Sequence, residues 1–362
     1  LLILLLIGAL SGSWMISGVV PTLIYYGMQV LSPTFFLASC CIICAIVSVM
    51  TGSSWTTIAT IGIALMGIGE ALGLSTGWTA GAIISGAYFG DKISPLSDTT
   101  VLASSTTNTP LFTHIRYMMY TTVPTMLITL IIFTVAGFMF DHDNAGQAMS
   151  FAASLKETFH ISAALMIVPI ATGILIAKRV APIITLFISA LLAAVFAILF
   201  QPDLLQQIAG AESINAASMF KGVFMTLYGS TQLETGNEML NSLVSTRGMA
   251  GMMNTIWLII CAMCFGGAMT ASGMLETITS VFMRFMQRRA SMVASTVFSG
   301  LTLNICTADQ YISIILTGNM FKEIYRKKGY ESRLLSRTTE DAVTVTSVLI
   351  PWNTCGMTQA TI

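Results

Sequence analysis

Charged and hydroxyl side chains interrupt an otherwise apolar part of the chain at residues 90–100, which read GDKISPLSDTT. Inside a bilayer, Asp91, Lys92 and Asp98 would have no water to solvate them, and Pro95 lacks a backbone donor. Such a stretch is stable at membrane depth only where protein or a water-filled cavity surrounds it. We therefore expect a site on an ion or substrate pathway here.

Asp98 is our first choice for a carboxylate that exchanges a proton for a cation, and Asp91 is the second. Partial burial raises the pKa of an aspartate towards neutrality, so that the protonated and the ionised forms both become accessible. Na⁺ prefers oxygen ligands, which hydroxyls, amides and the free carbonyls of a broken helix supply. Loading one ion would then expel the other. The nearby hydroxyls belong to Ser94, Ser97, Thr99 and Thr100.

The same charged residues also have structural interpretations. Asp98 is suited to cap the N-terminus of a half-helix. Asp91 and Lys92 could belong to an ion pair that holds the break closed. Because adjacent residues on a helix do not face each other, we expect Lys92 to pair with a distant acid such as Asp341.

The elements that must position these residues are membrane helices. Of the 362 residues, 55% are hydrophobic and 9% are charged, whereas an average soluble domain is about 25% charged. A helix needs about 20 apolar residues to cross a bilayer, and no alternating strands occur, so the chain is predicted to be an all-α polytopic membrane protein. The clearest apolar runs are 1–20, 34–50, 117–140, 160–177, 181–200 and 252–275.

Basic residues just outside the apolar runs indicate the orientation. By the positive-inside rule their side is cytoplasmic, so we expect a multi-pass protein of the cell (inner) membrane. These residues include Arg116, Lys178, Arg288 and the cluster from Lys322 to Arg337. His114 and Glu340 are expected at the same interface. The net charge of zero gives no indication of a nucleic-acid partner.

Two hairpins with polar tips, each followed by a broken helix, predict an inverted repeat. Corresponding interrupted segments in two halves indicate the binding site of a secondary transporter. Coincidence between two helices rich in serine and threonine is the alternative, since both residues are common in membrane helices. The hairpins lie at about 51–74 and 291–321, and the broken helices at about 78–100 and 338–362.

The predicted repeats add candidate ligands for an ion or substrate. Asn353 corresponds to Asp98 and can ligate Na⁺ through its carbonyl, but it cannot titrate, so the proton chemistry is expected in the first half. The hairpin tips contribute Ser54, Thr56, Asn304 and Asp309, and the second broken helix contributes Asp341, Thr346, Ser347, Asn353 and Thr354.

These assignments divide the chain into three parts. Residues 1–140 form the first transport repeat, residues 141–251 connecting helices and a polar linker, and residues 252–362 the second transport repeat. Because both ends lie within apolar runs, the chain is expected to be truncated at both ends.

Several motifs resemble those of the NhaC family of sodium/proton antiporters, a branch of the ion transporter superfamily. The resemblance covers nearly the whole chain, and relatives similar to malate/lactate antiporters share it. The motifs are GDKISPLSDTT at 90–100, LSRTTEDAVTVTSVLIPWNTCG at 335–356, TGSSWTT at 51–57 and DQYISIILTGNMF at 309–321.

This resemblance implies a secondary transporter that exchanges Na⁺ for H⁺ by alternating access. The implied partners are the lipid bilayer and small cations, and no cofactor is expected. Coupled transport of a small carboxylate such as malate or lactate stays open as an alternative, as does a homodimer. A channel is less favoured because channels do not need inverted repeats, and an enzyme is not expected because no catalytic motif occurs.

Overall fold

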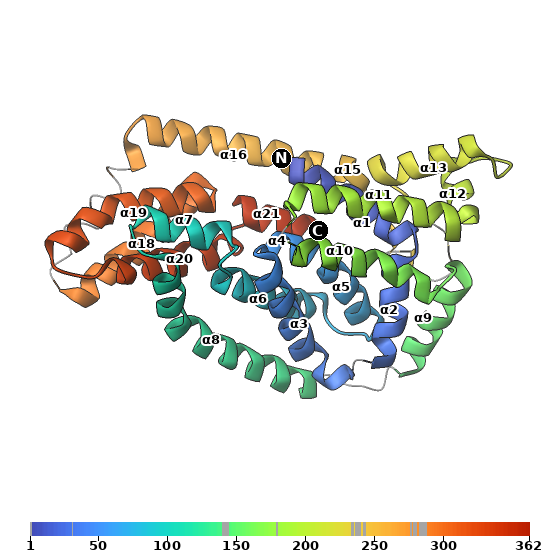
Figure 1. Ribbon diagram of the computed structural model, residues 1–362, viewed down its shortest axis with the longest axis horizontal. Helices are drawn as coiled ribbons and strands as arrows, with labels where there is room; N and C mark the ends of the chain where they lie inside the picture. The colour runs from blue at the N-terminus through green and yellow to red at the C-terminus, as the bar shows by residue number, and fades with distance from the viewer. Residues whose placement is uncertain are drawn as a thin grey trace. The chain divides into compact units, whose positions relative to one another are not determined.

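The computed structural model is helical through most of the residues that it describes (Figure 1). The only β-type pairing in that part of the chain is an isolated bridge between Thr231 and Thr246. The all-α prediction is therefore confirmed. The described residues are 2–30, 32–139, 145–178, 180–232, 235, 240–241, 244–275, 277, 281 and 288–362.

The apolar runs form helices that can span a membrane. In the described residues, five helices have the necessary length and hydropathy: Pro33–Thr51, Leu111–Met139, Pro182–Phe200, Gly248–Ala271 and Arg289–Thr307. Two further helix pairs qualify only when each bent pair is taken together. Leu2–Ile16 and Val19–Gln29 meet at 66°, and Phe151–Thr158 and Ala163–Ala177 meet at 90°. These spans confirm a polytopic membrane protein.

The chain is divided into two compact units. The first comprises Leu1–Ala87, Ile128–Met253 and Ile362, and the second comprises Tyr88–Leu127 and Asn254–Thr361. Helices α6 (Thr76–Ile93) and α8 (Leu111–Met139) contribute residues to both units. These units group the chain differently from the proposed repeats, and the inverted repeat stays a prediction.

The first unit is built around α1 (Leu2–Ile16), which packs against three later helices of the same unit. Gly8 and Gly12 make this packing close, because an added Cβ would lie 2.4 Å from the carbonyl oxygens of Gly248 and Thr226, respectively. The remaining helices of this unit are α2 (Val19–Val30), α3 (Phe36–Thr51), α4 (Ser54–Thr57), α5 (Ile63–Ala71), α9 (Ala145–Thr158), α10 (Ile167–Ala177), α11 (Pro182–Phe200), α12 (Pro202–Ala209), α13 (Ala216–Tyr228) and α15 (Gly248–Gly251).

The polar sequence at 51–57 forms a turn between α3 and α4 in the first unit. Gly52 ends α3 with a φ of 65°, a left-handed conformation that favours glycine. Ser53 then caps α4 by accepting a hydrogen bond from the backbone nitrogen of Thr56. Ser54 and Thr56 are both buried in the first turn of the returning helix.

The second unit contains a helical hairpin, one complete broken helix and the break of another, whose first helix α6 begins in the first unit. The hairpin arms α18 (Arg289–Thr307) and α19 (Gln310–Lys327) are joined by Ala308 and Asp309, and Asp309 caps α19 through a 3.0 Å hydrogen bond from the nitrogen of Ile312. One broken helix is α6 followed by α7 (Asp98–Thr106), and the other is α20 (Ser332–Ser347) followed by α21 (Thr354–Thr361). The unit also includes most of α16 (Met253–Ala271).

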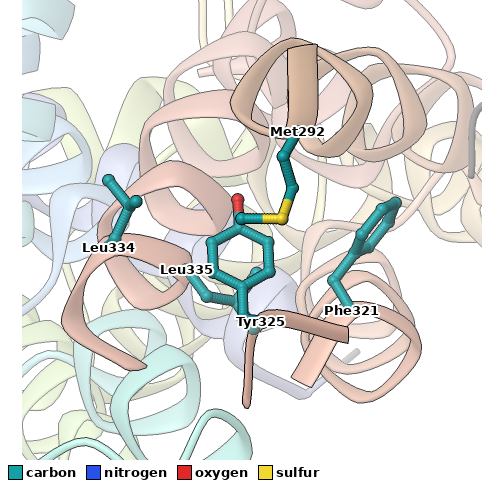
Figure 2. Packing of buried hydrophobic residues seen from close by; sticks show 5 residues of the cluster. All are labelled: Met292, Phe321, Tyr325, Leu334 and Leu335. Atoms are coloured by element: carbon teal, nitrogen blue, oxygen red, sulfur yellow. The ribbon is translucent and has the colours of Figure 1, made fainter. Parts of the chain in front are cut away.

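Helix α20 lies at the centre of the second unit. It packs against α18, α19 and α7, as Figure 1 shows for the orange and red helices around it. A buried hydrophobic cluster lies where the beginnings of α18 and α20 meet the end of α19 (Figure 2). It consists of Met292, Phe321, Tyr325, Leu334 and Leu335. Helix α20 buries polar residues such as Ser336 and Glu340 as well as these apolar ones.

Candidate functional site

The break between α6 and α7 is stabilised by its own hydroxyl groups. The hydroxyl of Thr100 donates to the carbonyl oxygens of Asp91 at 3.4 Å and Lys92 at 3.1 Å in the last turn of α6, and the Asp91 oxygen also accepts from the nitrogen of Ser94 at 3.2 Å. Ser97 caps α7 by accepting from the nitrogen of Thr100 at 3.4 Å, and its hydroxyl lies 3.0 Å from that of Thr99. Ser94, at the start of the break, is fully buried.

The three charges of the break differ in their exposure. Asp91 is 6% exposed and Lys92 is 5% exposed, whereas Asp98 is exposed at the first position of α7. Asp98 therefore lacks the partial burial that the sequence led us to expect. Asp91 is the buried carboxylate of the first broken helix.

Lys92 forms an ion pair with Asp341 of α20, and this pairing confirms the expectation that Lys92 reaches a distant acid. The other carboxylate oxygen of Asp341 accepts a hydrogen bond from the hydroxyl of Thr121 at 3.0 Å. Arg337, one helical turn earlier, has its Nε atom 3.9 Å from the same oxygen. The ion pair thus links the two broken helices within this unit.

Glu340 is fully buried, so the expectation that it is solvated at the cytoplasmic interface is wrong. One carboxylate oxygen accepts a hydrogen bond from the hydroxyl of Thr344 at 3.0 Å, while Oε2 has no hydrogen-bond partner. Lys92 and Asp91 lie within electrostatic range of this carboxylate. We call Asp91, Lys92, Glu340 and Asp341 the charged cluster.

His114 is also fully buried, so its expected interfacial position is wrong as well. Its Nδ1 atom lies 2.5 Å from the hydroxyl of Ser336 on α20, and its Nε2 atom has no partner. Both corrections have the same physical reason. Both residues lie near basic segments in the sequence, but Glu340 is on α20, which packs against α18, α19 and α7, and His114 of α8 faces Ser336 of the same helix.

A second polar group lies where the hairpin tip meets the break between α20 and α21. Asn353 donates to the side-chain oxygen of Asn304 at 2.9 Å, and the Thr354 hydroxyl donates to Asp309 at 3.3 Å. The hydroxyl of Ser347 donates to the side-chain oxygen of Gln310 at 3.3 Å. We call these six residues the tip cluster, and every one of them is buried.

Asn304 connects the tip cluster to α20. Its amide nitrogen donates to the carbonyl oxygen of Val343 at 3.0 Å and to the hydroxyl of Thr346 at 3.1 Å. The nitrogen of Thr354 donates to the carbonyl oxygen of Ala308 at 2.9 Å, which attaches the start of α21 to the hairpin tip. The structure therefore brings together the predicted residues of the second hairpin and the second broken helix. Ser54 and Thr56 belong to the other unit.

One face of α20 joins the charged cluster to the tip cluster. Ser336, Glu340, Thr344 and Ser347 follow each other at intervals of one helical turn and are fully buried. The span from the first to the last is about 16 Å at 1.5 Å per residue. Ser336 and Gln310 were not predicted from the sequence. The helical spacing of the polar residues in α20 could have indicated Ser336.

This arrangement defines a class of protein. A multi-pass helical membrane protein that buries charges and oxygen ligands at helix breaks is organised as a secondary transporter. The model of the family described as the Na⁺/H⁺ antiporter family matches residues 1–101 and 86–362 of the chain. The chain belongs to the Na⁺/H⁺ antiporter family, and it is a multi-pass protein of the bacterial cell membrane.

Curated relatives cover nearly all of the chain. The malate-2H⁺/Na⁺-lactate antiporter of Bacillus subtilis is 39% identical over 99% of this chain and 74% of its own length. The Na⁺/H⁺ antiporter NhaC of Alkalihalophilus pseudofirmus is 37% identical over 98% and 74%. The arginine/ornithine antiporter ArcD of Halobacterium salinarum is 32% identical over 99% and 72%. No solved structure matches the chain.

Proposed function

We propose that this protein exchanges Na⁺ for H⁺, with protons held by the charged cluster and Na⁺ held by oxygens of the tip cluster. The observation that carries the proposal is a surplus of buried negative charge. The charged cluster contains the buried carboxylates of Asp91 and Glu340 and the carboxylate of Asp341, whose side chain is 27% exposed, but a single lysine. Arg337 lies at its edge and is partly exposed.

Surplus negative charge in a buried site is costly unless another positive charge compensates it. Removing an ion from water costs several kcal/mol even after the surroundings relax. Lys92 is committed to Asp341, and Glu340 keeps one carboxylate oxygen without a hydrogen-bond partner. A proton on Glu340 or Asp91 removes this cost, and a cation held nearby reduces it.

The tip cluster supplies the ligand types that Na⁺ prefers. Asn304, Asn353 and Gln310 contribute amide oxygens, Thr354 a hydroxyl and Asp309 a carboxylate that is 8% exposed. The broken helix adds backbone carbonyls at the same place. One carboxylate among neutral oxygens fits a monovalent cation.

The two clusters are proposed to work by electrostatic competition. Na⁺ bound at the tip cluster lowers the affinity of the charged cluster for protons, and protonation lowers the affinity for Na⁺. Either loaded form reduces the surplus charge, while the empty form leaves all of it in place. Only loaded forms should therefore change their access from one side of the membrane to the other.

The charges of the site favour a cation over an organic acid. An unshared buried positive charge would strengthen the binding of a carboxylate cargo, but Lys92 is the only buried lysine or arginine among the described residues and it is paired with Asp341. The names of the relatives from B. subtilis and H. salinarum make malate, lactate and arginine the alternative cargoes to test.

Purified protein in proteoliposomes with a preset pH difference tests the proposed exchange. Addition of NaCl should dissipate the pH difference in the absence of any organic solute, while choline chloride should not. If dissipation requires malate, lactate or arginine in addition to Na⁺, then the Na⁺/H⁺ exchange proposed here is wrong. Empty liposomes control for passive leakage.

A further inference from the structure

A pocket outside the charged and tip clusters opens at the surface of the second unit. It has a volume of 170 Å³ and lies between the beginning of α8, the beginning of α18 and the turn that joins α19 to α20. Its polar lining includes two guanidinium groups and two phenol rings. The lining residues used below are Tyr117, Arg289, Tyr330, Glu331, Arg333 and Leu334.

The polar side of the pocket suits a phosphate group. The guanidinium of Arg333 lies 5.0 Å from the ring centre of Tyr117, and that of Arg337 lies 4.6 Å from the same ring, so cation–π contacts hold both in place. A guanidinium matches the paired oxygens of a phosphate better than an ammonium does. Arg289 provides the second charge in the lining.

Glu331 is the single acid in the lining, and it pairs with Arg333. The two side chains are 66% and 43% exposed, respectively, so water screens their attraction. Exposed ion pairs of this kind contribute little to stability. A phosphate group, which accepts paired hydrogen bonds from a guanidinium, can therefore replace the Glu331 carboxylate at Arg333.

The floor of the pocket is apolar. Leu334 is 4% exposed and belongs to the buried cluster of Figure 2, where it lies near Leu335 and Tyr325. Tyr117 and Tyr330 pack against the same cluster. A ligand that combines an anionic group with apolar atoms therefore fits this pocket better than a small hydrated ion.

The pocket lies at the level where phospholipid headgroups are expected. The candidate span of α18 begins at Arg289, and that of α8 begins at Leu111, about 9 Å along the helix from Tyr117. Its basic surroundings belong to the segment from Lys322 to Arg337, which the positive-inside rule makes cytoplasmic. Basic pockets between membrane helices on this side bind anionic headgroups. We propose that this pocket binds the phosphate of an anionic phospholipid from the cytoplasmic leaflet.

Native mass spectrometry of the full chain in detergent, titrated with phosphatidylglycerol, tests the proposal. We expect one preferred phosphatidylglycerol per chain and binding at least about tenfold weaker for phosphatidylcholine, whose choline group cancels the negative charge. The double substitution R289Q/R333Q should weaken phosphatidylglycerol binding by a similar factor. Because Arg289 is exposed at the start of α18, R289Q alone should keep the fold and still weaken binding severalfold.

Arg326 offers a matched control in the same basic segment. Its side chain is 77% exposed, pairs with Glu323 and does not line the pocket, so R326Q should bind phosphatidylglycerol like the parent chain. Equal binding by R289Q/R333Q and the parent chain would overturn the proposal, as would equal affinity for phosphatidylcholine. Inorganic phosphate is the third probe, and full displacement of phosphatidylglycerol by phosphate at equal concentration would refute the lipid assignment.

Discussion

At the scale of single residues, burial separates the carboxylates that the sequence presents as similar. Asp98 is exposed at the start of α7, whereas Asp91 and Glu340 are buried beside Lys92. A carboxylate that is enclosed by protein holds a proton more readily than an exposed one, because desolvation disfavours the ionised form. Proton exchange is therefore proposed for Glu340 and Asp91 instead of Asp98.

Replacing Glu340 with glutamine should abolish coupled exchange without lowering stability. The amide keeps the size of the side chain and removes a buried negative charge that lacks a hydrogen bond at Oε2, so the thermal unfolding midpoint should stay unchanged or rise. Sodium-driven dissipation of the pH difference and thermal unfolding in detergent measure the two effects. E323Q, at an exposed position of α19, is the control. A strongly lowered midpoint would instead identify Glu340 as a structural residue.

The substitution D341N should destabilise the protein through Lys92. It leaves a buried ammonium without its counter-charge, and breaking such a pair costs about 3 kcal/mol. The further substitution K92M should recover much of this loss, which a double-mutant cycle of unfolding free energies will detect. By comparison, E323Q breaks an exposed pair and should cost less than about 1 kcal/mol. Additive effects of D341N and K92M would show that the pair is not coupled.

At the scale of elements, the hairpin tip and the broken helices depend on each other. The start of α21 is attached to the α18–α19 turn by the backbone of Thr354, and Asn353 reaches Asn304 across the same contact. The buried face of α20 extends from there to Glu340 and Ser336. Coupling between the clusters therefore has a continuous polar connection within one unit.

Replacing Asn353 with alanine should weaken Na⁺ activation more than it affects the maximal rate. The change removes an amide oxygen and a buried hydrogen bond to Asn304, a loss of about 1–3 kcal/mol. We expect the Na⁺ concentration for half-maximal exchange to rise by at least about fivefold. T302A, at a half-buried position of α18 outside the tip cluster, is the matched control. An unchanged Na⁺ requirement would remove Asn353 from the proposed ligands.

At the scale of the whole molecule, membership in the antiporter family and the buried charge surplus require that Na⁺ and H⁺ affinities are linked. Linkage is reciprocal, so a proton that weakens Na⁺ binding must itself bind more weakly when Na⁺ is present. Lowering the pH should therefore protonate the charged cluster and raise the apparent Na⁺ dissociation constant.

In the limit of one competing proton, the apparent Na⁺ dissociation constant should rise about tenfold for each unit by which the pH falls. Equilibrium Na⁺ binding measured across a pH series checks this slope. E340Q should flatten the dependence, while E323Q should keep it. A constant affinity for Na⁺ over the series would rule out competition.

Much of the membrane architecture follows from the sequence, because the length of an apolar run decides locally whether a helix can span a bilayer. The pairing of Lys92 with Asp341 was also predictable, since neighbours on a helix cannot face each other. The exposure of Asp98 could not be predicted, because it depends on how α7 packs against α19 and α20.

By itself, the sequence determined the all-α membrane class, the family and the presence of interrupted helices at about 78–100 and 338–362. Each can be recognised within a single segment, from the length of an apolar run, a motif, or a proline among charged and hydroxyl residues. Only the tertiary structure decided that Glu340 and His114 are enclosed and that Asn304, Asp309 and Asn353 meet. Burial is a property of the packing of several helices, and no single segment contains that information.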